Sequence, residues 1–205
     1  MLTFGEEKDL MLIQIEALEM IAKMAEAKEG LTSEHMNNVG KYAFLIAKKL
    51  GIPEKECREL QYAAKIHDLG KMHVPEMILN KAGKLTDDEF RIIKSHTWMG
   101  LDIIQKVKYN PIVKKAEDII LYHHENYNGK GYPEGLTGEC IPVSARIVRI
   151  ADAFDALVSK RMYKESWHPD NALKYLEKQR GKLFDPHITD LFLEIVTGNG
   201  KLEKG

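Results

Sequence analysis

Several features that would place this sequence in a specialised class of protein are scarce or missing. Its 205 residues include two cysteines, Cys57 and Cys140, which lie far apart and in no metal-type spacing. This excludes a disulfide-stabilised scaffold and a cysteine-rich zinc site, and it predicts a reduced, cytoplasmic protein. The longest unbroken apolar run is the six residues from Tyr42 to Ala47, and the first residues lack the pattern of a secretory signal. We therefore expect no membrane span.

The sequence also has no excess of charge of either sign. Lys and Arg number 30, Asp and Glu number 31, and the formal net charge is -1. Such a balance argues against a nucleic-acid polymer or an anionic membrane as the partner. Apolar residues make up 44% and charged residues 30% of the chain, which is typical of a globular domain with a substantial core.

Strand signals are almost absent, whereas helix signals recur along the whole chain. No segment sustains the alternation of apolar and polar residues that a half-buried strand needs. Residues 6–28 are rich in good helix formers, and Thr86 to Glu89 form a capping-box pattern. We therefore predict an all-α fold, a compact helical bundle. Its helices are expected at residues 6–28, 33–50, 54–68, 86–105, 111–125, 142–160, 169–180 and 186–196.

Histidines and aspartates occupy positions at which these helices should face the core. His67, for example, continues the apolar stripe formed by Leu60 and Ala64. Burying many ionisable groups costs free energy unless they pair with one another or bind a cation. The complete set, drawn from five predicted helices, is His35, His67, Asp68, His96, His123, His124 and Asp152.

Such a set favours a centre with two metal ions. Adjacent residues on a helix diverge by about 100 degrees, so the pairs His67-Asp68 and His123-His124 can each serve two neighbouring points. Imidazole and carboxylate ligands suit Fe, Mn, Zn or Ni. Two ions about 3.5–4 Å apart are the arrangement that hydrolyses phosphoesters. An oxygen-activating di-iron bundle is an alternative, but such sites rely on Glu and Glu-x-x-His pairs, and this set is poor in Glu.

Several motifs of the chain resemble those of the HD superfamily of metal-dependent phosphohydrolases. His67-Asp68 followed by Leu69-Gly70-Lys71 is similar to the signature of that superfamily. The segment from His123 to Pro133 resembles the hallmark loop of its HD-GYP branch. Further blocks at residues 150–157, 161–164 and 184–186 agree with that branch in order and spacing.

The resemblance implies a fold, an activity and a division of the chain. The fold is a bundle of the HD-domain type with an extra leading helix and a long GYP loop. Residues 1–28 would form the leading helix, 29–197 the HD-GYP phosphodiesterase domain and 198–205 a polar tail. Members of this branch are bacterial phosphodiesterases that linearise or fully hydrolyse cyclic di-GMP with Fe or Mn, and some act on cyclic GMP-AMP.

The resemblance also distributes the candidate ligands between two divalent ions, with Fe or Mn favoured. One ion would be held by His35, His67, Asp68 and Asp152, and Asp68 would bridge to a second ion held by His96, His123 and His124. Some members hold a third ion through a Glu four residues before the first ligand histidine, where this chain has Leu31. Glu29 and Glu34 do not sit in that register, so the implied centre has two ions.

The implied reaction is the hydrolysis of cyclic di-GMP to linear pGpG, and in some members on to GMP. Two divalent ions would lower the pKa of a bridging water and give hydroxide near neutral pH. Lys71 would bind a phosphate oxygen or protonate the leaving group, and Arg161 and Lys164 would bind phosphate. Glu125 is expected to orient a ligand histidine. Asn128 stands where Asp is common, which keeps the turn but removes a charge.

Other readings of the same motifs remain open at the level of sequence. The chain could hydrolyse cyclic GMP-AMP or other nucleotides, or it could bind a cyclic dinucleotide as a signalling module without cleaving it. The leading helix could mediate a homodimer or follow a sensor or receiver domain, and a signalling protein could be a further partner. The GYP loop either edges the substrate cleft, meets a regulatory partner or only closes a long connection.

Overall fold

Helices dominate the part of the chain that the computed structural model describes, which is residues 4–30, 33–107, 110–159 and 166–198. Among these residues no strand occurs, and the predicted all-α bundle is confirmed. The elements are α1 (Phe4–Lys28), α2 (Ser33–Lys49), α3 (Glu54–Lys65), η1 (Leu69–His73), α4 (Glu76–Leu79), α5 (Asp87–Lys94), α6 (His96–Ile104), α7 (Pro111–Tyr122), η2 (Gly138–Cys140), α8 (Val143–Val158), α9 (Pro169–Lys178) and α10 (Pro186–Gly198).

Capping residues explain where two of the helices begin. The side chain of Thr86 accepts a hydrogen bond from the amide of Glu89, whose carboxylate accepts one from the amide of Thr86. This is the predicted capping box, and it opens α5. The Asn110 side chain likewise accepts a hydrogen bond from the amide of Ile112, and Pro111 takes the first position of α7.

Three helices are shorter than the sequence predicts. The predicted helix 54–68 ends at Lys65, where Ile66 has turned out of the helical conformation. The predicted helix 86–105 is interrupted at Ser95, which separates α5 from α6. α7 ends at Tyr122 rather than at residue 125. These early ends place several of the candidate ligands in turns.

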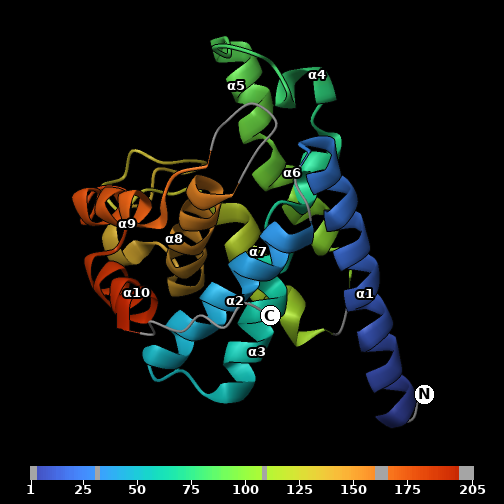
Figure 1. Cartoon of the computed structure of the whole chain (residues 1–205). Coiled ribbons are helices and arrows are strands. Elements are labelled where there is room, and N and C mark those ends of the chain that lie inside the picture. Colours follow the sequence, from blue (N-terminus) through green and yellow to red (C-terminus); the bar gives the residue numbers. More distant parts are fainter. Residues whose placement is uncertain (1–3, 31–32, 108–109, 160–165, 199–205) are drawn as a thin grey trace.

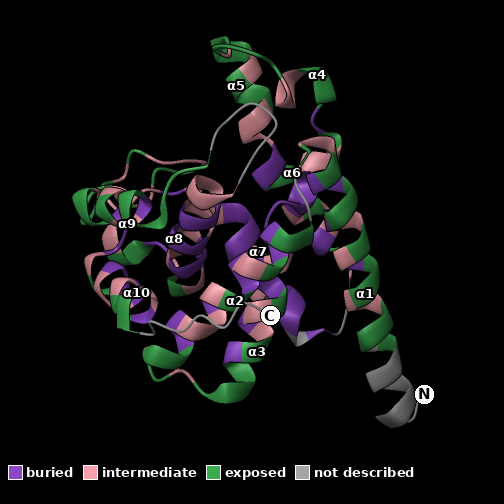
Figure 2. Ribbon diagram, in the orientation of Figure 1, coloured by how far each residue is buried: buried purple, intermediate pink, exposed green. Residues whose placement is uncertain are grey.

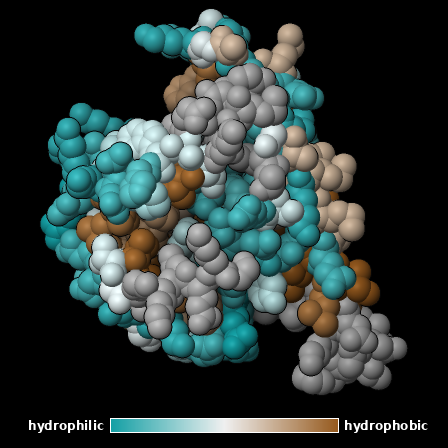
Figure 3. All heavy atoms as spheres, viewed as in Figure 1, coloured by the Kyte–Doolittle hydropathy of each residue, from teal (hydrophilic) through white to brown (hydrophobic). Residues whose placement is uncertain are grey.

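The leading helix α1 lies along one edge of the molecule (Figure 1). It packs against η1, α2 and α3, and its inward face buries Leu18, Ala22 and Ala25. Its outer face is exposed (Figure 2), and apolar residues lie along that face (Figure 3). Among the described residues, no helix combines the length and the apolar composition needed to cross a bilayer.

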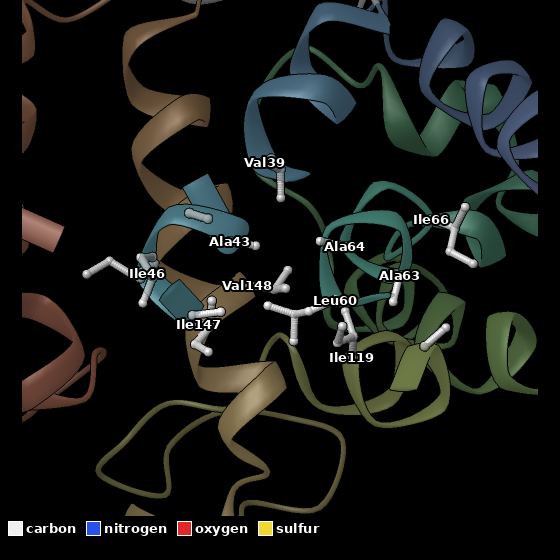
Figure 4. Close-up of a cluster of buried hydrophobic side chains, with 14 of the residues drawn as sticks. Val39, Ala43, Ile46, Leu60, Ala63, Ala64, Ile66, Ile119, Ile147 and Val148 are labelled. Atoms are coloured by element: carbon white, nitrogen blue, oxygen red, sulfur yellow. The ribbon is translucent and has the colours of Figure 1, made fainter. Parts of the chain in front are cut away.

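The core lies where α2, α3, α7 and α8 meet. α2 packs against both α3 and α8, and α7 packs against α3 and α8. Small residues such as Ala43 and Ala64 are fully buried at these contacts, which lets the helices approach one another closely. Larger residues such as Ile119, Ile147 and Val148 fill the remaining space (Figure 4). This rigid centre holds the ends of the helices that carry the candidate site.

Candidate metal centre

The structure brings the seven candidate ligands together from segments that are far apart in the sequence. Two groups of donor atoms form, and within each group all atoms lie within 4.8 Å of one another. One group contains Asp68, His96, His123 and His124, and the other contains Glu26, His35 and His67. Asp152 adjoins the second of these, because its Oδ1 lies 3.5 Å from Nε2 of His35. We call His35, His67 and Asp152 the first cluster, and His96, His123 and His124 the second cluster.

The sequence predicts that the two pairs of neighbouring ligands lie on helices, and this prediction is wrong because both pairs lie in turns. His67 and Asp68 connect α3 to η1, and His123 and His124 follow the last turn of α7. In both places the helix has ended one or two residues earlier. A turn still directs adjacent side chains to different points. His67 lies in the first cluster while Asp68 faces both clusters, whereas His123 and His124 both belong to the second cluster.

Asp68 stands between the two clusters. Its Oδ2 lies 3.1 Å from Nε2 of His67 in the first cluster. Its Oδ1 lies 3.4 Å from Nε2 of His96 and 3.5 Å from Nε2 of His123 in the second cluster. Two donors that each bind one ion at about 2.1 Å can be at most about 4.2 Å apart. The two oxygens of this carboxylate are therefore spaced to bind two ions, one on each side.

Hydrogen bonds fix the orientation of the imidazole rings. Nδ1 of His67 lies 2.8 Å from the carbonyl oxygen of Ala64, and Nδ1 of His96 lies 2.7 Å from that of Ile93. Nδ1 of His123 is 2.9 Å from the carbonyl oxygen of Ile119. A carbonyl can only accept, so each Nδ1 carries a proton, and Nε2 is the nitrogen left to bind an ion once it carries no proton itself.

Four ring nitrogens of the centre are buried and have no hydrogen-bond partner among the described residues. They are Nε2 of His35, His67, His96 and His123. Leaving so many polar atoms unsatisfied in the interior is costly. Divalent cations, one in each cluster, would satisfy them, since imidazole nitrogen and carboxylate oxygen are the usual ligands of such ions. The donor set thus fits a metal centre on its chemistry as well as on its spacing.

The pKa values of the second cluster and of Asp68 suit cation binding. Burial lowers the pKa of His96 to about 4, and burial likewise holds the pKa of His124 well below its usual range. Burial opposes ionisation of Asp68, but Lys71 and His67 outweigh it and keep the pKa of that carboxyl well below its usual range. Neutral imidazoles and an ionised carboxylate are the protonation states that bind metal.

Lys71 is attached to this centre rather than solvated. Its side chain is only 13% exposed, and its Nζ lies 2.7 Å from Oδ2 of Asp68 and 2.8 Å from Oε1 of Glu29 on α1. Burial alone would lower the pKa of Lys71, but these two carboxylates raise it instead. The amine therefore stays charged beside the candidate bridge. Arg161 and Lys164, the other candidate phosphate-binding residues, lie outside the described residues.

The GYP loop folds over the second cluster. The ring of Tyr132 stacks on the ring of His124, with centroids 4.7 Å apart. Gly131 has no room for a side chain, because a Cβ there would lie 2.5 Å from Cα of Glu125 and 2.6 Å from the carbonyl oxygen of His124. Glu125 does not play the expected role of orienting a histidine. Its Oε1 accepts hydrogen bonds from two loop amides, those of Glu134 and Gly135, and so pins the loop.

Comparisons with known proteins identify the family of the chain. The model of the HD domain family matches residues 19–188. The chain belongs to the HD domain family. This HD domain is 44% identical over 189 residues to the cyclic di-GMP phosphodiesterase response regulator RpfG of Xanthomonas campestris. It is also 37% identical over 174 residues to the 3'3'-cGAMP-specific phosphodiesterase 2 of Vibrio cholerae.

The HD domain covers only part of these relatives. The matches include 92% and 85% of this chain but 49% and 33% of the two curated proteins. Among solved structures, Bd1817, an HDG"Y"P protein of Bdellovibrio bacteriovorus, has a TM-score of 0.64 at 27% identity. That match covers 81% of this chain and 52% of the other. It supports the HD-type bundle that the sequence predicts.

The HD domain also contains two acidic residues that sequence reasoning missed. Asp155 lies on α8, and its Oδ2 is 2.6 Å from Nδ1 of His35, so it orients that ring as the carbonyls orient the others. Its spacing of three residues from Asp152 is the one signal that could have indicated it. Glu26 lies on α1, and burial raises its pKa to about 7. No spacing rule connects Glu26 to the ligands, because it comes from a separate helix.

Metal affinity is expected to rise with pH. Burial would lower the pKa of His35, but the carboxylates of Asp152 and Asp155 raise it to about 10. Burial also opposes charge on His67, but Asp68 raises its pKa to about 9. Both rings are therefore protonated at neutral pH without metal, and an ion must displace a proton from each. Affinity should increase up to about pH 9, by about tenfold per pH unit for each proton released.

Calorimetric titration with Mn²⁺ checks this expectation. Repeating the titration in buffers with different ionisation enthalpies counts the protons released on binding. An affinity that is constant between about pH 7 and 9, with no proton release, would contradict the protonation states given above.

Proposed function

We propose that this HD domain is a metal-dependent phosphodiesterase that hydrolyses cyclic di-GMP to linear pGpG. The observation that carries the proposal is the position of Asp68, whose two oxygens face two separate sets of imidazoles at 3.1 to 3.5 Å. The relatives of the chain include a cyclic di-GMP phosphodiesterase response regulator, which supports the same activity.

Two divalent ions, Fe or Mn, would be held by the residues already described. The first cluster and Oδ2 of Asp68 would hold one ion, and the second cluster and Oδ1 of Asp68 would hold the other. When bound, such a pair provides an ionised water near neutral pH and draws charge from the phosphoryl oxygens. Asp68 is thus the residue on which both positions depend.

Lys71 would act on the substrate from the side of the first cluster. Its ammonium group is held in place by Asp68 and Glu29, so it loses little freedom when a phosphate arrives. It can donate a hydrogen bond to a non-bridging oxygen, or a proton to the departing 3′ oxygen.

Arg161 and Lys164 are proposed to bind a substrate phosphate, as the family motif implies. Arg161→Ala should then raise KM for cyclic di-GMP about 10- to 100-fold, the loss expected for a charged hydrogen bond. Its metal content should not change. Arg58→Ala is the matched control, because Arg58 is 66% exposed and pairs with Glu54 on the surface. A loss of metal in Arg161→Ala would show that this residue does not act as a phosphate clamp.

The test of the proposed function is a turnover assay on protein purified without oxygen and loaded with Fe²⁺ or Mn²⁺. Cyclic di-GMP should be consumed, and chromatography should identify pGpG as the first product, with GMP only if a second cleavage follows. Metal-loaded protein that cleaves none of several cyclic dinucleotides would remove the proposal. Tight binding without product would instead favour a signalling module that senses the nucleotide.

A second candidate substrate is cyclic GMP-AMP. The observation that favours it is the 37% identity to a phosphodiesterase named as specific for 3'3'-cGAMP. Rates on the two dinucleotides, measured side by side with the same metal-loaded sample, decide between them. A preference for cyclic GMP-AMP would leave the proposed metal-dependent hydrolysis unchanged and would replace cyclic di-GMP as the proposed substrate.

The exposed side of α1 is proposed to pair with α1 of a second copy. Leu10, Ile13, Ala17, Met20 and Met24 are exposed there and follow one another in steps of three and four residues. That spacing is the seam of a two-stranded coiled coil. A sensor or receiver domain that precedes α1 could then regulate the dimer through this coiled coil. Light scattering should show a dimer that Ile13→Glu dissociates, and a monomeric native chain would refute the pairing.

A further inference from the structure

The carboxylate of Glu26 is buried and has no hydrogen-bond partner in the part of the chain that the structure describes. Glu26 lies near the end of α1, on the face that also buries Ala22 and Ala25, and only 2% of its surface is exposed. Both Oε1 and Oε2 are enclosed without a donor nearby. An isolated carboxylate in such a place is strongly unfavourable unless a cation accompanies it. Among the described residues no hydrogen-bond donor satisfies this carboxylate, so a cation bound beside it would stabilise it.

Ring nitrogens of His35 and His67 in the first cluster lie close to this carboxylate. Oε1 of Glu26 lies 3.9 Å from Nε2 of His35, and donor atoms of Glu26, His35 and His67 all lie within 4.8 Å of one another. The nitrogens of both histidines are themselves buried and unsatisfied. Two ligands on opposite sides of one ion are about 4.2 Å apart. The carboxylate and the two rings are thus placed around a space that one ion can fill.

We propose that Glu26 is a metal ligand, which α1 contributes to the first cluster. The inference rests on the proposed metal centre but not on the identity of the substrate. It gives the two positions different ligands, since the first would have carboxylates from Glu26, Asp152 and Asp68, whereas the second would be dominated by imidazole. A harder, oxygen-rich position binds Mn²⁺ and Fe²⁺ better relative to softer ions.

The same end of α1 is already attached to the segment that carries Lys71. Nζ of Lys28 donates hydrogen bonds to the carbonyl oxygens of Met72 and Val74, at 3.0 and 2.7 Å. Oε1 of Glu29 pairs with Lys71 at 2.8 Å. If Glu26 binds the ion, the last turns of α1 would contact the metal, Lys71 and η1 at the same time. Docking of α1 and occupancy of the first position would then be coupled.

The test is Mn²⁺ binding by the full chain carrying Glu26→Gln, which keeps the size of the side chain and removes its charge. The affinity for one of the two ions should fall at least tenfold, and gel-filtered protein should retain about one ion fewer per chain. Without metal, Glu26→Gln should melt above the native protein, because a buried charge is gone. With Mn²⁺ it should melt below it. A purely structural role would shift both melting temperatures in the same direction.

Glu19→Gln is the matched control, because Glu19 lies on the same helix, is also partly buried, and pairs with Lys65 rather than with the ligand histidines. It removes one charge from α1 and should leave Mn²⁺ affinity unchanged. If Glu26→Gln does not fold, Glu26→Asp decides, since its shorter side chain should also weaken binding. Unchanged affinity in the Glu26 variants, with metal bound normally by the native chain, overturns the inference alone. A native chain that binds no metal overturns the proposed centre as well.

Discussion

Asp68→Ala is expected to abolish both metal binding and hydrolysis. The carboxylate faces the two clusters with different oxygens, so its removal takes one ligand from each position at once. Loss of a single group that stabilises a transition state typically costs about 10²- to 10³-fold in rate. Loss of both ions should cost more, because the water would no longer be ionised near neutral pH. Elemental analysis and the pGpG assay measure the two effects.

The variant also needs a control for folding. Breaking a buried ion pair by removing one partner typically costs about 3–5 kcal/mol, and Asp68 is paired with Lys71 and faces three imidazoles. Asp68→Asn keeps the shape of the side chain and one strong acceptor, so it should fold when Asp68→Ala does not. Asp102→Ala, at a 69% exposed side chain on α6, should change neither metal content nor rate. Two ions per chain in Asp68→Ala would refute the bridge.

Gly70→Ala should destabilise the fold and separate the two clusters. A Cβ at this position would overlap the carbonyl oxygen of His96 and lie 2.5 Å from the amide nitrogen of Gly100. Both neighbours are backbone atoms of α6, so the strain cannot be relieved by turning a side chain. The segment η1 must move away from α6, and Asp68 then moves away from His96. Overpacking of this kind costs about 1–3 kcal/mol.

Thermal unfolding without metal measures the cost of Gly70→Ala. A domain of this size loses about 2–4 °C in melting temperature per kcal/mol. Gly198→Ala serves as the comparison, because a Cβ there meets nothing within 4 Å at the end of α10. It should be neutral or slightly stabilising, as alanine favours helix over glycine. An unchanged melting temperature in Gly70→Ala would show that η1 and α6 are not held as closely as described.

The sequence predicts those features of this HD domain that depend on local patterns. The capping box at Thr86 is local, and it opens α5 as predicted. The inward apolar stripes of the helices are local too, and they are sufficient to predict that His35, His96 and Asp152 point toward the interior. The exact end of a helix is less local. His67 and His123 continue an apolar stripe whether the helix goes on or stops one turn earlier, so the periodicity could not show that both lie in turns.

The remaining features depend on tertiary contacts that no spacing reports. His35 and Asp155 are 120 residues apart, and their hydrogen bond exists only because α2 packs against α8. From the sequence alone, Lys71 is expected to be a solvated residue after a helix. Its pairing with Glu29 at the end of α1 depends on the tertiary structure. Glu26 is concealed in the same way, since an acidic residue on a charged helix gives no sign of being buried.

The helix ends beside the ligands have an electrostatic consequence. α3 and α7 each stop within a turn of a ligand histidine, and the carbonyls of Ala64 and Ile119 near those ends hold the rings. The carboxyl end of a helix macrodipole carries the equivalent of about half a negative charge. Two such ends meeting at one place create a negative potential before any carboxylate is counted. This backbone field would favour cations in the centre even in variants that have lost an acidic side chain.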